Sequence, residues 1–275
     1  MPELPEVETV ANGVHARIHG QTVVGVQTSN KPQTFKSPPD EIVEALTGSR
    51  IERVHRVGKT IVVDLSRKDS GRKKKHTQFL VHLGMTGRLL VSTPDTPAPP
   101  HTHATLTLSS GKELRFVDPR RFGRLSVVAP DTRYEGPGAE PLTISLEDFI
   151  ALFHHRKTPI KAALLNQSLL HGVGNIYADE ALFHAGIRPT RHAGRLTRAE
   201  LGRLRDALIK VLTEAIQLGG SSVSDYVDAD GVAGFFQLRH HVYSRTGQPC
   251  RVCGTPIKRI VIGGRSTHYC PKCQH

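Results

Sequence analysis

The second residue, Pro2, becomes a free secondary amine if Met1 is removed, and the carboxylate of Glu3 follows it directly. An α-amino group has a pKa of about 8, compared with about 10.4 for lysine, so part of it is unprotonated and nucleophilic near neutral pH. Attack of such an amine on a sugar C1′ gives an iminium, and a neighbouring carboxyl group can move the protons that this chemistry requires. The same two residues also suit a helix start, which is the simpler interpretation of the pair taken alone.

All four cysteines lie at the C-terminal end, as Cys250-x2-Cys253 and Cys270-x2-Cys273. Two CxxC turns can aim four thiolates at one ion, and this spacing predicts a tetrahedral Zn²⁺ site. Two disulfides are the alternative, which the absence of an export signal in the sequence disfavours. A closed shell of four thiolates leaves no open coordination position, so we expect one structural Zn²⁺ and not a catalytic one.

The composition is strongly basic. The 275 residues include 37 Lys and Arg against 25 Asp and Glu, a formal net charge of +12 and a pI near 9.8. This balance indicates a polyanionic partner such as nucleic acid. The sequence contains no run that is long and apolar enough to span a bilayer and no secretory h-region near its start, so we expect a cytoplasmic protein without a membrane partner.

Positive charge also dominates the cysteine-rich end. From Arg239 onward there are seven Lys and Arg residues and no Asp or Glu, a charge pattern that suits a phosphate backbone. Residues 258–264 (KRIVIGG) predict a strand and a Gly-Gly turn, after which Arg265 can reach into a groove. Taken singly, most of these cations are better explained as solvated surface charges.

The elements that must position these residues follow from periodicity. Apolar residues at helical spacing predict an amphipathic helix over 4–18, which Pro2 and Glu3 would cap. Eight short β-type runs between residues 22 and 128 predict a two-layer β-sandwich or flattened barrel. The basic run 67–76 is most simply a solvated hairpin loop, with contact to phosphates as the alternative.

The second half of the chain is predicted to be helical. A segment rich in Pro and Gly ends the β region, and four helical patterns follow it. Between two of them, Gly172, Gly174 and Asn175 precede a helix N-terminus, which can bind a phosphate but is more often ordinary helix capping. We expect an α+β multi-domain fold, with an N-terminal β-sandwich domain at 2–130, a linker at 131–145, a helical domain at 146–237 and a zinc finger at 238–275.

Six motifs in order carry a family resemblance. They are PELPEVETV at the N-terminus, GKT at 58–60, HLGMTG at 82–87, DPRRFG at 118–123, GVGNIYADEALF at 172–183 and the terminal four-cysteine finger. Together they resemble bacterial formamidopyrimidine-DNA glycosylase, the 8-oxoguanine repair family, over the whole chain. The resemblance implies a helix-two-turn-helix domain, a double-stranded DNA partner that contains oxidised bases, and a bifunctional glycosylase and abasic-site lyase that acts by β,δ-elimination.

The resemblance also implies roles for single residues. Pro2 would be the nucleophile at C1′ and Glu3 the general acid and base, while Lys59 and Arg265 would contact phosphate beside the reacting nucleotide. A nucleotide that leaves the base stack also vacates space that must be filled. The residues that match the family's filling and strand-contacting positions are Met85, Arg120, Arg121 and Phe122. Lys161, Asn175 and Arg265 would grip flanking phosphates and fix register, not sequence.

A loop over residues 219–231 corresponds to the family's lid over the extruded base. The candidates for contact with 8-oxoguanine in it are Ser221, Ser222, Val223, Ser224, Asp225 and Tyr226. Two other functions remain open, an endonuclease VIII-type glycosylase for oxidised pyrimidines and a non-catalytic zinc-ribbon DNA-binding protein. Leu4 and the DPRRFG motif favour the purine enzyme over the first of these, and we expect a monomer.

Overall fold

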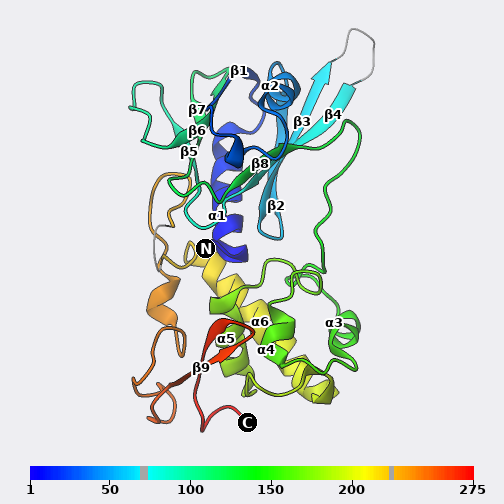
Figure 1. Ribbon diagram of the computed structural model, residues 1–275, viewed down its shortest axis with the longest axis vertical. Coiled ribbons are helices and arrows are strands. Elements are labelled where there is room, and N and C mark those ends of the chain that lie inside the picture. The colour runs from blue at the N-terminus through cyan, green and yellow to red at the C-terminus, as the bar shows by residue number, and fades with distance from the viewer. Residues whose placement is uncertain (69–73, 223–225) are drawn as a thin grey trace. The chain divides into compact units, whose positions relative to one another are not determined.

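The computed structural model describes residues 1–68, 74–222 and 226–275, and the chain forms two compact units (Figure 1). The first unit combines Met1–Glu135 with Gly219–Gly234, and the second combines Gly136–Leu218 with Phe235–His275. The loop 219–231, which the sequence analysis placed with the helices, therefore packs in the first unit. Among the described helices, none combines the length and the apolar character needed to cross a membrane.

The first unit contains two antiparallel four-stranded sheets, which confirms the predicted two-layer β architecture. One sheet has the order β1 (Val23–Thr28), β6 (Thr102–Leu108), β7 (Glu113–Val117) and β5 (Arg88–Ser92). The other has the order β2 (Arg50–Val57), β3 (Thr60–Lys68), β4 (Lys74–His82) and β8 (Arg124–Val127). All eight predicted β runs form strands. The basic run joins β3 to β4, which pair as far as Lys68 and Lys74, and its tip lies outside the described residues.

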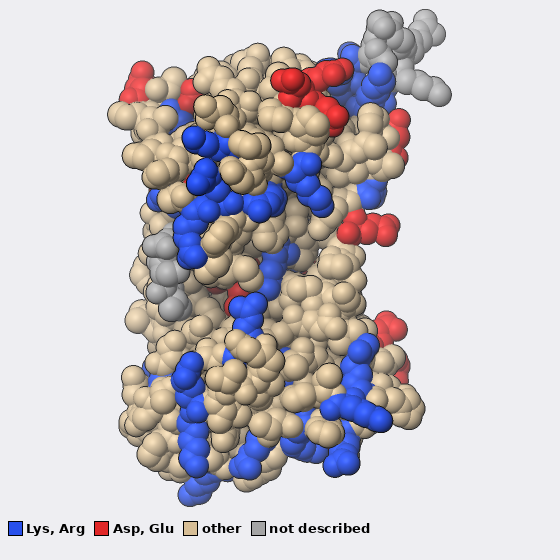
Figure 2. All heavy atoms as spheres, in the orientation of Figure 1, with Lys and Arg blue, Asp and Glu red and all other residues tan. Residues whose placement is uncertain are grey.

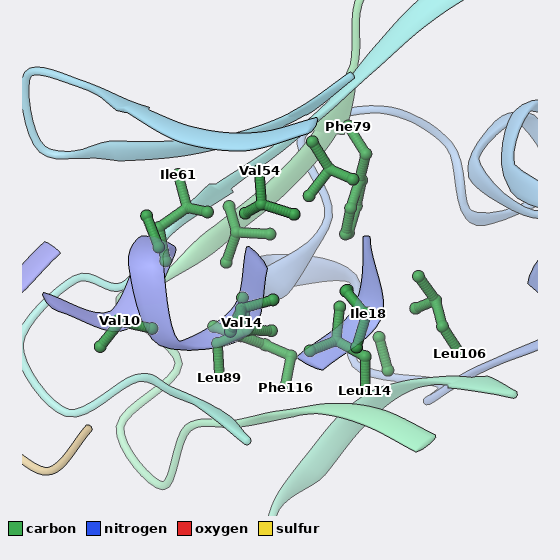
Figure 3. Close-up of a cluster of buried hydrophobic side chains, with 14 of the residues drawn as sticks. Val10, Val14, Ile18, Val54, Ile61, Phe79, Leu89, Leu106, Leu114 and Phe116 are labelled. Carbon is green, nitrogen blue, oxygen red and sulfur yellow. The ribbon is translucent and has the colours of Figure 1, made fainter. Parts of the chain in front are cut away.

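Helix α1 (Leu4–Ile18) packs between the two sheets (Figure 3). Its apolar residues recur every three or four positions, so Val10, Val14 and Ile18 share buried faces. Figure 3 shows Val54, Ile61 and Phe79 on one side of the helix and Leu89, Leu106, Leu114 and Phe116 on the other. Burying a side chain of this size contributes roughly 1.5–3 kcal/mol, so the N-terminal helix is anchored firmly in the core.

One helix of this unit was missed by the sequence analysis. Helix α2 (Pro39–Leu46) follows the 3₁₀ turn η1 (Pro32–Thr34) and lies in a region that we predicted to be β throughout. The paired prolines Pro38 and Pro39 suggest a break, but proline is favoured at the first position of a helix. Ile42 and Leu46, four residues apart, are both fully buried, and this spacing was the available signal.

The second unit is helical with a C-terminal hairpin, as predicted. It contains α3 (Leu146–Phe153), α4 (Ile160–Leu164), α5 (Asn175–Ala185), α6 (Arg198–Gln217), the 3₁₀ turns η2 (Ala193–Arg195) and η3 (Phe236–Arg239), and the hairpin of β9 (Lys258–Ile262) and β10 (Arg265–Tyr269). The predicted cap of α3 is confirmed, since Ser145 Oγ accepts the Asp148 N–H at 3.1 Å. Phe183 of α5 packs against the cysteines of the finger, which joins the hairpin to the helices.

Candidate functional site

The N-terminal residues are held by the start of α1. Glu3 is the N-cap residue, and its backbone N–H donates to Glu6 Oε2 at 2.7 Å in a capping box. Pro2 is buried, and the side chain of Glu3 is only 5% exposed. Because α1 is part of the core, the position of Pro2 is fixed relative to the sheets of the first unit.

A second buried carboxylate, Glu6, links the helix to the loop 219–231. Glu6 Oε1 accepts the backbone N–H of Ser221 at 2.7 Å, and the Tyr226 hydroxyl donates to the Glu6 carbonyl at 3.4 Å. Gly220 has φ +82°, and a Cβ there would approach Glu6 Cγ to 2.9 Å, so the close approach requires glycine. Burial, with the nearby charge of Glu6, raises the pKa of Tyr226 above its usual range. The loop is therefore fixed to α1 at Ser221 and at Tyr226.

The loop candidates do not share one environment. Ser221 and Tyr226 are buried, and the Tyr226 ring belongs to the core of the first unit. Ser222 Oγ donates to the Tyr226 carbonyl and accepts the Gly234 N–H, each at 2.9 Å. The remaining candidates, Val223, Ser224 and Asp225, lie outside the described residues.

Lys59 is half-buried in the two-residue turn between β2 and β3. Gly58, its partner in the turn, has φ +60°, a conformation that favours glycine in tight hairpins. Arg56 Nη1 donates to the Gly58 carbonyl at 3.2 Å and steadies the turn. Burial, followed by the nearby ammonium of Lys59, lowers the pKa of His82 at the end of β4. His82 is thus neutral near pH 7, and its Nδ1 accepts the Gly84 N–H at 3.2 Å.

Two loops of the first unit, one between β4 and β5 and one between β7 and β8, meet at the buried side chain of Asp118. Its Oδ1 accepts the Thr86 hydroxyl at 2.5 Å, and its Oδ2 accepts the Gly123 N–H at 2.7 Å. The backbones touch at Gly84, where a Cβ would come within 2.5 Å of Gly123 N. Asp118 therefore fixes one loop against the other.

These two loops present the predicted filling residues at the surface of the first unit. Met85 is 40% exposed and Phe122 is 46% exposed, although both are large apolar side chains. The guanidinium of Arg120 lies 4.6 Å from the centre of the Phe122 ring, a cation–π contact. Arg121 is exposed and has φ +55°, which turns the chain sharply between them. Figure 2 shows Lys and Arg side chains gathered on the viewed face of this unit, with most acidic ones at its margins.

In the second unit, the N-terminus of α5 lies beside the hairpin. Asn175 begins α5, and its Nδ2 donates to Ser266 Oγ of β10 at 3.4 Å. Arg265 is exposed at the start of β10, after a turn in which Gly263 and Gly264 both have positive φ. The structure thus brings Asn175 and the Arg265 strand together, as a shared phosphate-binding site requires. Lys and Arg side chains are spread over the viewed face of this unit (Figure 2).

Lys161 lies in a different environment from the one we predicted. Its side chain is fully buried, with Nζ 2.6 Å from Asp179 Oδ1 and 2.7 Å from the Ser266 carbonyl. Asp179 Oδ2 in turn accepts the backbone N–H of His268 at 2.9 Å and lies 3.1 Å from His268 Nδ1. The ammonium is enclosed in this structure, so a contact with phosphate would require the pair with Asp179 to open, and the phosphate contact of Lys161 stays a prediction. Lys161 joins α4 to α5 through Asp179 and to β10 through the carbonyl of Ser266, the residue that follows Arg265.

The four cysteines form the site of one structural zinc ion. Their sulfur atoms all lie within 4.8 Å of one another, with Cys250 and Cys273 3.9 Å apart and Cys253 and Cys270 3.5 Å apart. Zn–S bonds of about 2.3 Å in a tetrahedron place neighbouring sulfurs about 3.8 Å apart, which fits these distances. The Cys273 N–H points at Cys270 Sγ from 3.4 Å, as expected for a knuckle that supports a thiolate. The thiolates of this shell would hold the ion and bind the two knuckles into one fold.

Comparisons with known proteins match the chain from end to end. Residues 1–125 match the formamidopyrimidine-DNA glycosylase N-terminal domain, 136–227 the helix-two-turn-helix (H2TH) domain of the same enzyme, and 247–275 the zinc finger found in FPG and IleRS. A formamidopyrimidine-DNA glycosylase of Solibacter usitatus is 46% identical, over 100% of this chain and 99% of its own. The chain belongs to the formamidopyrimidine-DNA glycosylase family.

Solved structures of the same family agree. MutM (Fpg) from Thermus thermophilus is 42% identical, with a TM-score of 0.84 over 99% of this chain and 98% of its own. Wild-type Lactococcus lactis Fpg, in a complex with DNA that contains an N7-benzyl-Fapy-dG, is 32% identical with a TM-score of 0.86 over the whole of both chains. The family's fold therefore extends over both units of this protein and its finger.

Three of the buried acids in this family member hold candidate site residues in place and were not singled out by the sequence analysis. They are Glu6, which fixes Glu3 and the loop 219–231, Asp118, which joins two loops, and Asp179, which holds Lys161. Only Glu6 had a usable signal, because Glu3 and Glu6 have the spacing of a capping box. The partners of Asp118 and Asp179 are distant in sequence, so their burial could not be predicted from spacing.

Proposed function

We propose that this chain is a base excision repair enzyme that removes 8-oxoguanine and formamidopyrimidines from duplex DNA and then cuts the abasic strand. One observation carries the proposal: a proline stands directly behind the initiator, at the start of a buried helix and next to the buried carboxylate of Glu3. The solved complexes of Lactococcus lactis Fpg with lesion-containing DNA support the substrate class. We expect a monomer that acts on the DNA of the cytoplasm.

In the proposed chemistry, the lone pair of the Pro2 nitrogen forms a bond to C1′ while the bond from C1′ to the damaged base breaks. The base takes up a proton as it leaves, and opening of the sugar ring gives an iminium with Pro2. Glu3 is held beside this nitrogen by its own N-cap position and supplies and accepts the protons at O4′ and C2′. Loss of the C2′ proton then drives β-elimination of the phosphate at C3′, and loss of the C4′ proton drives δ-elimination of the phosphate at C5′, so the strand is cut on both sides.

The other predicted residues have supporting roles in this proposal. Lys59, in its glycine turn, and Arg265, on the hairpin, would bind the phosphates that flank the lesion together with Asn175. Met85 and Phe122 would enter the space left by the extruded nucleotide, because both are exposed and apolar. The guanidinium of Arg120 can hydrogen-bond the acceptors of the orphaned base, and Arg121 would contact the same strand.

The loop 219–231 would cover the extruded base. The Ser221 side chain and the Tyr226 ring are both enclosed, so neither is placed to contact a base directly. We therefore propose that Ser222 and the main chain of the loop contact the lesion. Tyr226 would serve to fix the loop to α1 through its bond to Glu6.

Borohydride trapping tests the proposal. Zinc-loaded protein is incubated with duplexes that carry 8-oxoguanine, an oxidised pyrimidine or no lesion, and covalent protein–DNA adducts are counted after reduction. We expect fast adduct formation on 8-oxoguanine and little on undamaged DNA. Preference for the oxidised pyrimidine would indicate an endonuclease VIII-type specificity, and no adduct on any duplex would leave only DNA binding.

The intact mass of each preparation is the matched control. Protein that retains Met1 has no free proline amine, so it should bind the same DNA but form no adduct. Equal trapping by the Met1-retained and Met1-free forms would contradict Pro2 as the nucleophile.

A further inference from the structure

A second cluster of metal-ligand side chains lies in the second unit, apart from the four cysteines. Glu180 and His184 are four residues apart on α5, and His241 lies in the segment after η3. One ligand atom from each of the three lies within 4.8 Å of the other two. Residues four apart on a helix share a face, so α5 can offer two ligands to one ion. The proposed glycosylase chemistry uses none of these three side chains.

The carboxylate of Glu180 is fixed and still has coordinating capacity. Its Oε1 accepts the backbone N–H groups of Val242 and Tyr243, and its Oε2 accepts that of His241, all at 2.9 Å. An ionised carboxylate has about four lone-pair sites, so three hydrogen bonds leave one site, on Oε2. The side chain is 1% exposed, which means that its orientation is set by these three bonds.

That remaining site faces His241. His241 Nδ1 lies 3.6 Å from Glu180 Oε2, which is too long for a hydrogen bond, and no other hydrogen-bond partner for this buried nitrogen exists among the described residues. A buried polar atom normally has a partner, because leaving it without one costs free energy. The Phe183 ring stacks on the His241 ring, with centroids 5.3 Å apart, and holds it in this orientation.

His184 completes the cluster from the solvent side. Its ring centroid is 4.6 Å from that of His241, and its side chain is exposed, so it can rotate without disturbing the core. Ligand atoms about 2.0–2.1 Å from a tetrahedral zinc ion are about 3.4 Å apart. The separation of 3.6 Å between Glu180 Oε2 and His241 Nδ1 is already near this value, and rotation of the exposed imidazole brings the third ligand into range.

We propose that Glu180, His184 and His241 bind a second divalent transition-metal ion, with Zn²⁺ as the ion of choice and water in the fourth position. Two imidazoles and one carboxylate favour Zn²⁺, Cu²⁺ and Ni²⁺ over Mg²⁺ and Ca²⁺, which prefer oxygen ligands. The site differs from the finger in having no thiolate and one face open to solvent. The ion joins α5 to the segment that leads into the finger and stabilises the second unit.

The test uses full-length protein whose four-cysteine site is already loaded with zinc. Added Zn²⁺ is counted by equilibrium dialysis, and its effect on the midpoint of thermal unfolding is measured in parallel. We expect one further Zn²⁺ ion, the further equivalent, to bind per protein molecule. Added Zn²⁺ should raise the midpoint of thermal unfolding, because the ion binds the folded state. In His184→Ala, the affinity for this further ion should fall roughly tenfold or more. With Co²⁺ as a probe, this equivalent should give ligand-field bands without thiolate charge transfer.

Two further variants make the result specific. His241→Gln should also weaken the further equivalent by roughly tenfold or more. His155→Ala, which removes an exposed histidine that packs against His154 elsewhere in the same unit, should leave the binding of this equivalent unchanged. Alanine is the best helix former, so His184→Ala preserves α5 and a loss of binding there reports on the ligand. The absence of a further equivalent, its survival in both cluster variants, or its equal loss in His155→Ala would overturn the proposal.

Discussion

The buried pair of Lys161 and Asp179 gives a direct way to separate a positioning role from phosphate contact. We consider Lys161→Met, Asp179→Ala and the double variant Lys161→Met/Asp179→Leu, each made in full-length, zinc-loaded protein. Methionine keeps most of the volume of the lysine stem and can follow the same path through the core. The variants therefore remove charge and hydrogen bonds with little change in packing.

The magnitudes follow from the contacts. Both side chains are fully buried, so removing one partner leaves an uncompensated buried charge, which costs about 3–5 kcal/mol. Asp179→Ala should lie at the upper end, because it also removes the acceptor for two groups of His268. The double variant leaves no buried charge, but the His268 donors and the Ser266 carbonyl lose their partners, so we expect about 1–3 kcal/mol. The two substitutions are thus strongly non-additive.

Thermal unfolding and DNA binding are measured on the same samples. A loss of about 3–5 kcal/mol lowers the unfolding midpoint by roughly 10–20 °C for a unit of this size. The control is Glu147→Ala, which removes an exposed ion pair with Arg198 and should shift the midpoint by no more than about 4 °C. Affinity for an abasic-site duplex is measured by fluorescence anisotropy over a range of salt concentrations.

The two roles of Lys161 predict different results. If Lys161 contacts phosphate, Lys161→Met should leave the unfolding midpoint unchanged and should reduce the slope of log affinity against log salt concentration by about one. The double variant should then bind DNA no better than the single variant. If Lys161 positions the hairpin, the midpoint falls in the single variant, and both the midpoint and the affinity recover in the double variant.

Three further predictions concern other parts of the chain. Asp118→Asn should lower the free energy of unfolding by about 1–3 kcal/mol and slow single-turnover excision, because one amide oxygen cannot replace two carboxylate acceptors. An unchanged excision rate would show that excision does not depend on the bonds that Asp118 makes between the two loops. The hydrogen bond from Arg191 holds the pKa of Glu200 at about 2, below its usual 4.5, so the second unit should lose stability as pH falls from about 4.5 towards 2, and Glu200→Gln should flatten that part of the curve. Removing zinc with a chelator should abolish DNA binding, and Zn²⁺ should restore it; binding that survives removal would contradict the structural role of the finger.

Local patterns predicted the elements of this chain well. Periodicity, caps and cysteine spacing, which all act over a few residues, predicted the eight strands, the helices α1, α3, α4, α5 and α6, and the zinc site. Helix α2 was missed because proline at a helix start resembles a break. The loop 219–231 was assigned to the helical part because it follows α6 in sequence, while its hydrogen bonds go to Glu6 and to β5.

The candidate site was predictable only in part, and the reason is burial. Sequence gives the type of a side chain but not its exposure, so Lys161 was expected at a phosphate, although Asp179 encloses it. Tyr226 was expected to contact the lesion, but its ring is part of the core. Met85 and Phe122, in contrast, were expected to fill the space left by the extruded nucleotide, and both are exposed, which that role requires.

The central claim is that the Pro2 nitrogen forms the covalent bond to DNA. After borohydride reduction on an 8-oxoguanine duplex, the adduct is digested with protease and nuclease, and the modified peptide is sequenced by mass spectrometry. We expect a deoxyribose remnant on the N-terminal nitrogen of Pro2, and no adduct in the fraction that retains Met1. A remnant on a lysine side chain, such as Lys59, would contradict the central claim.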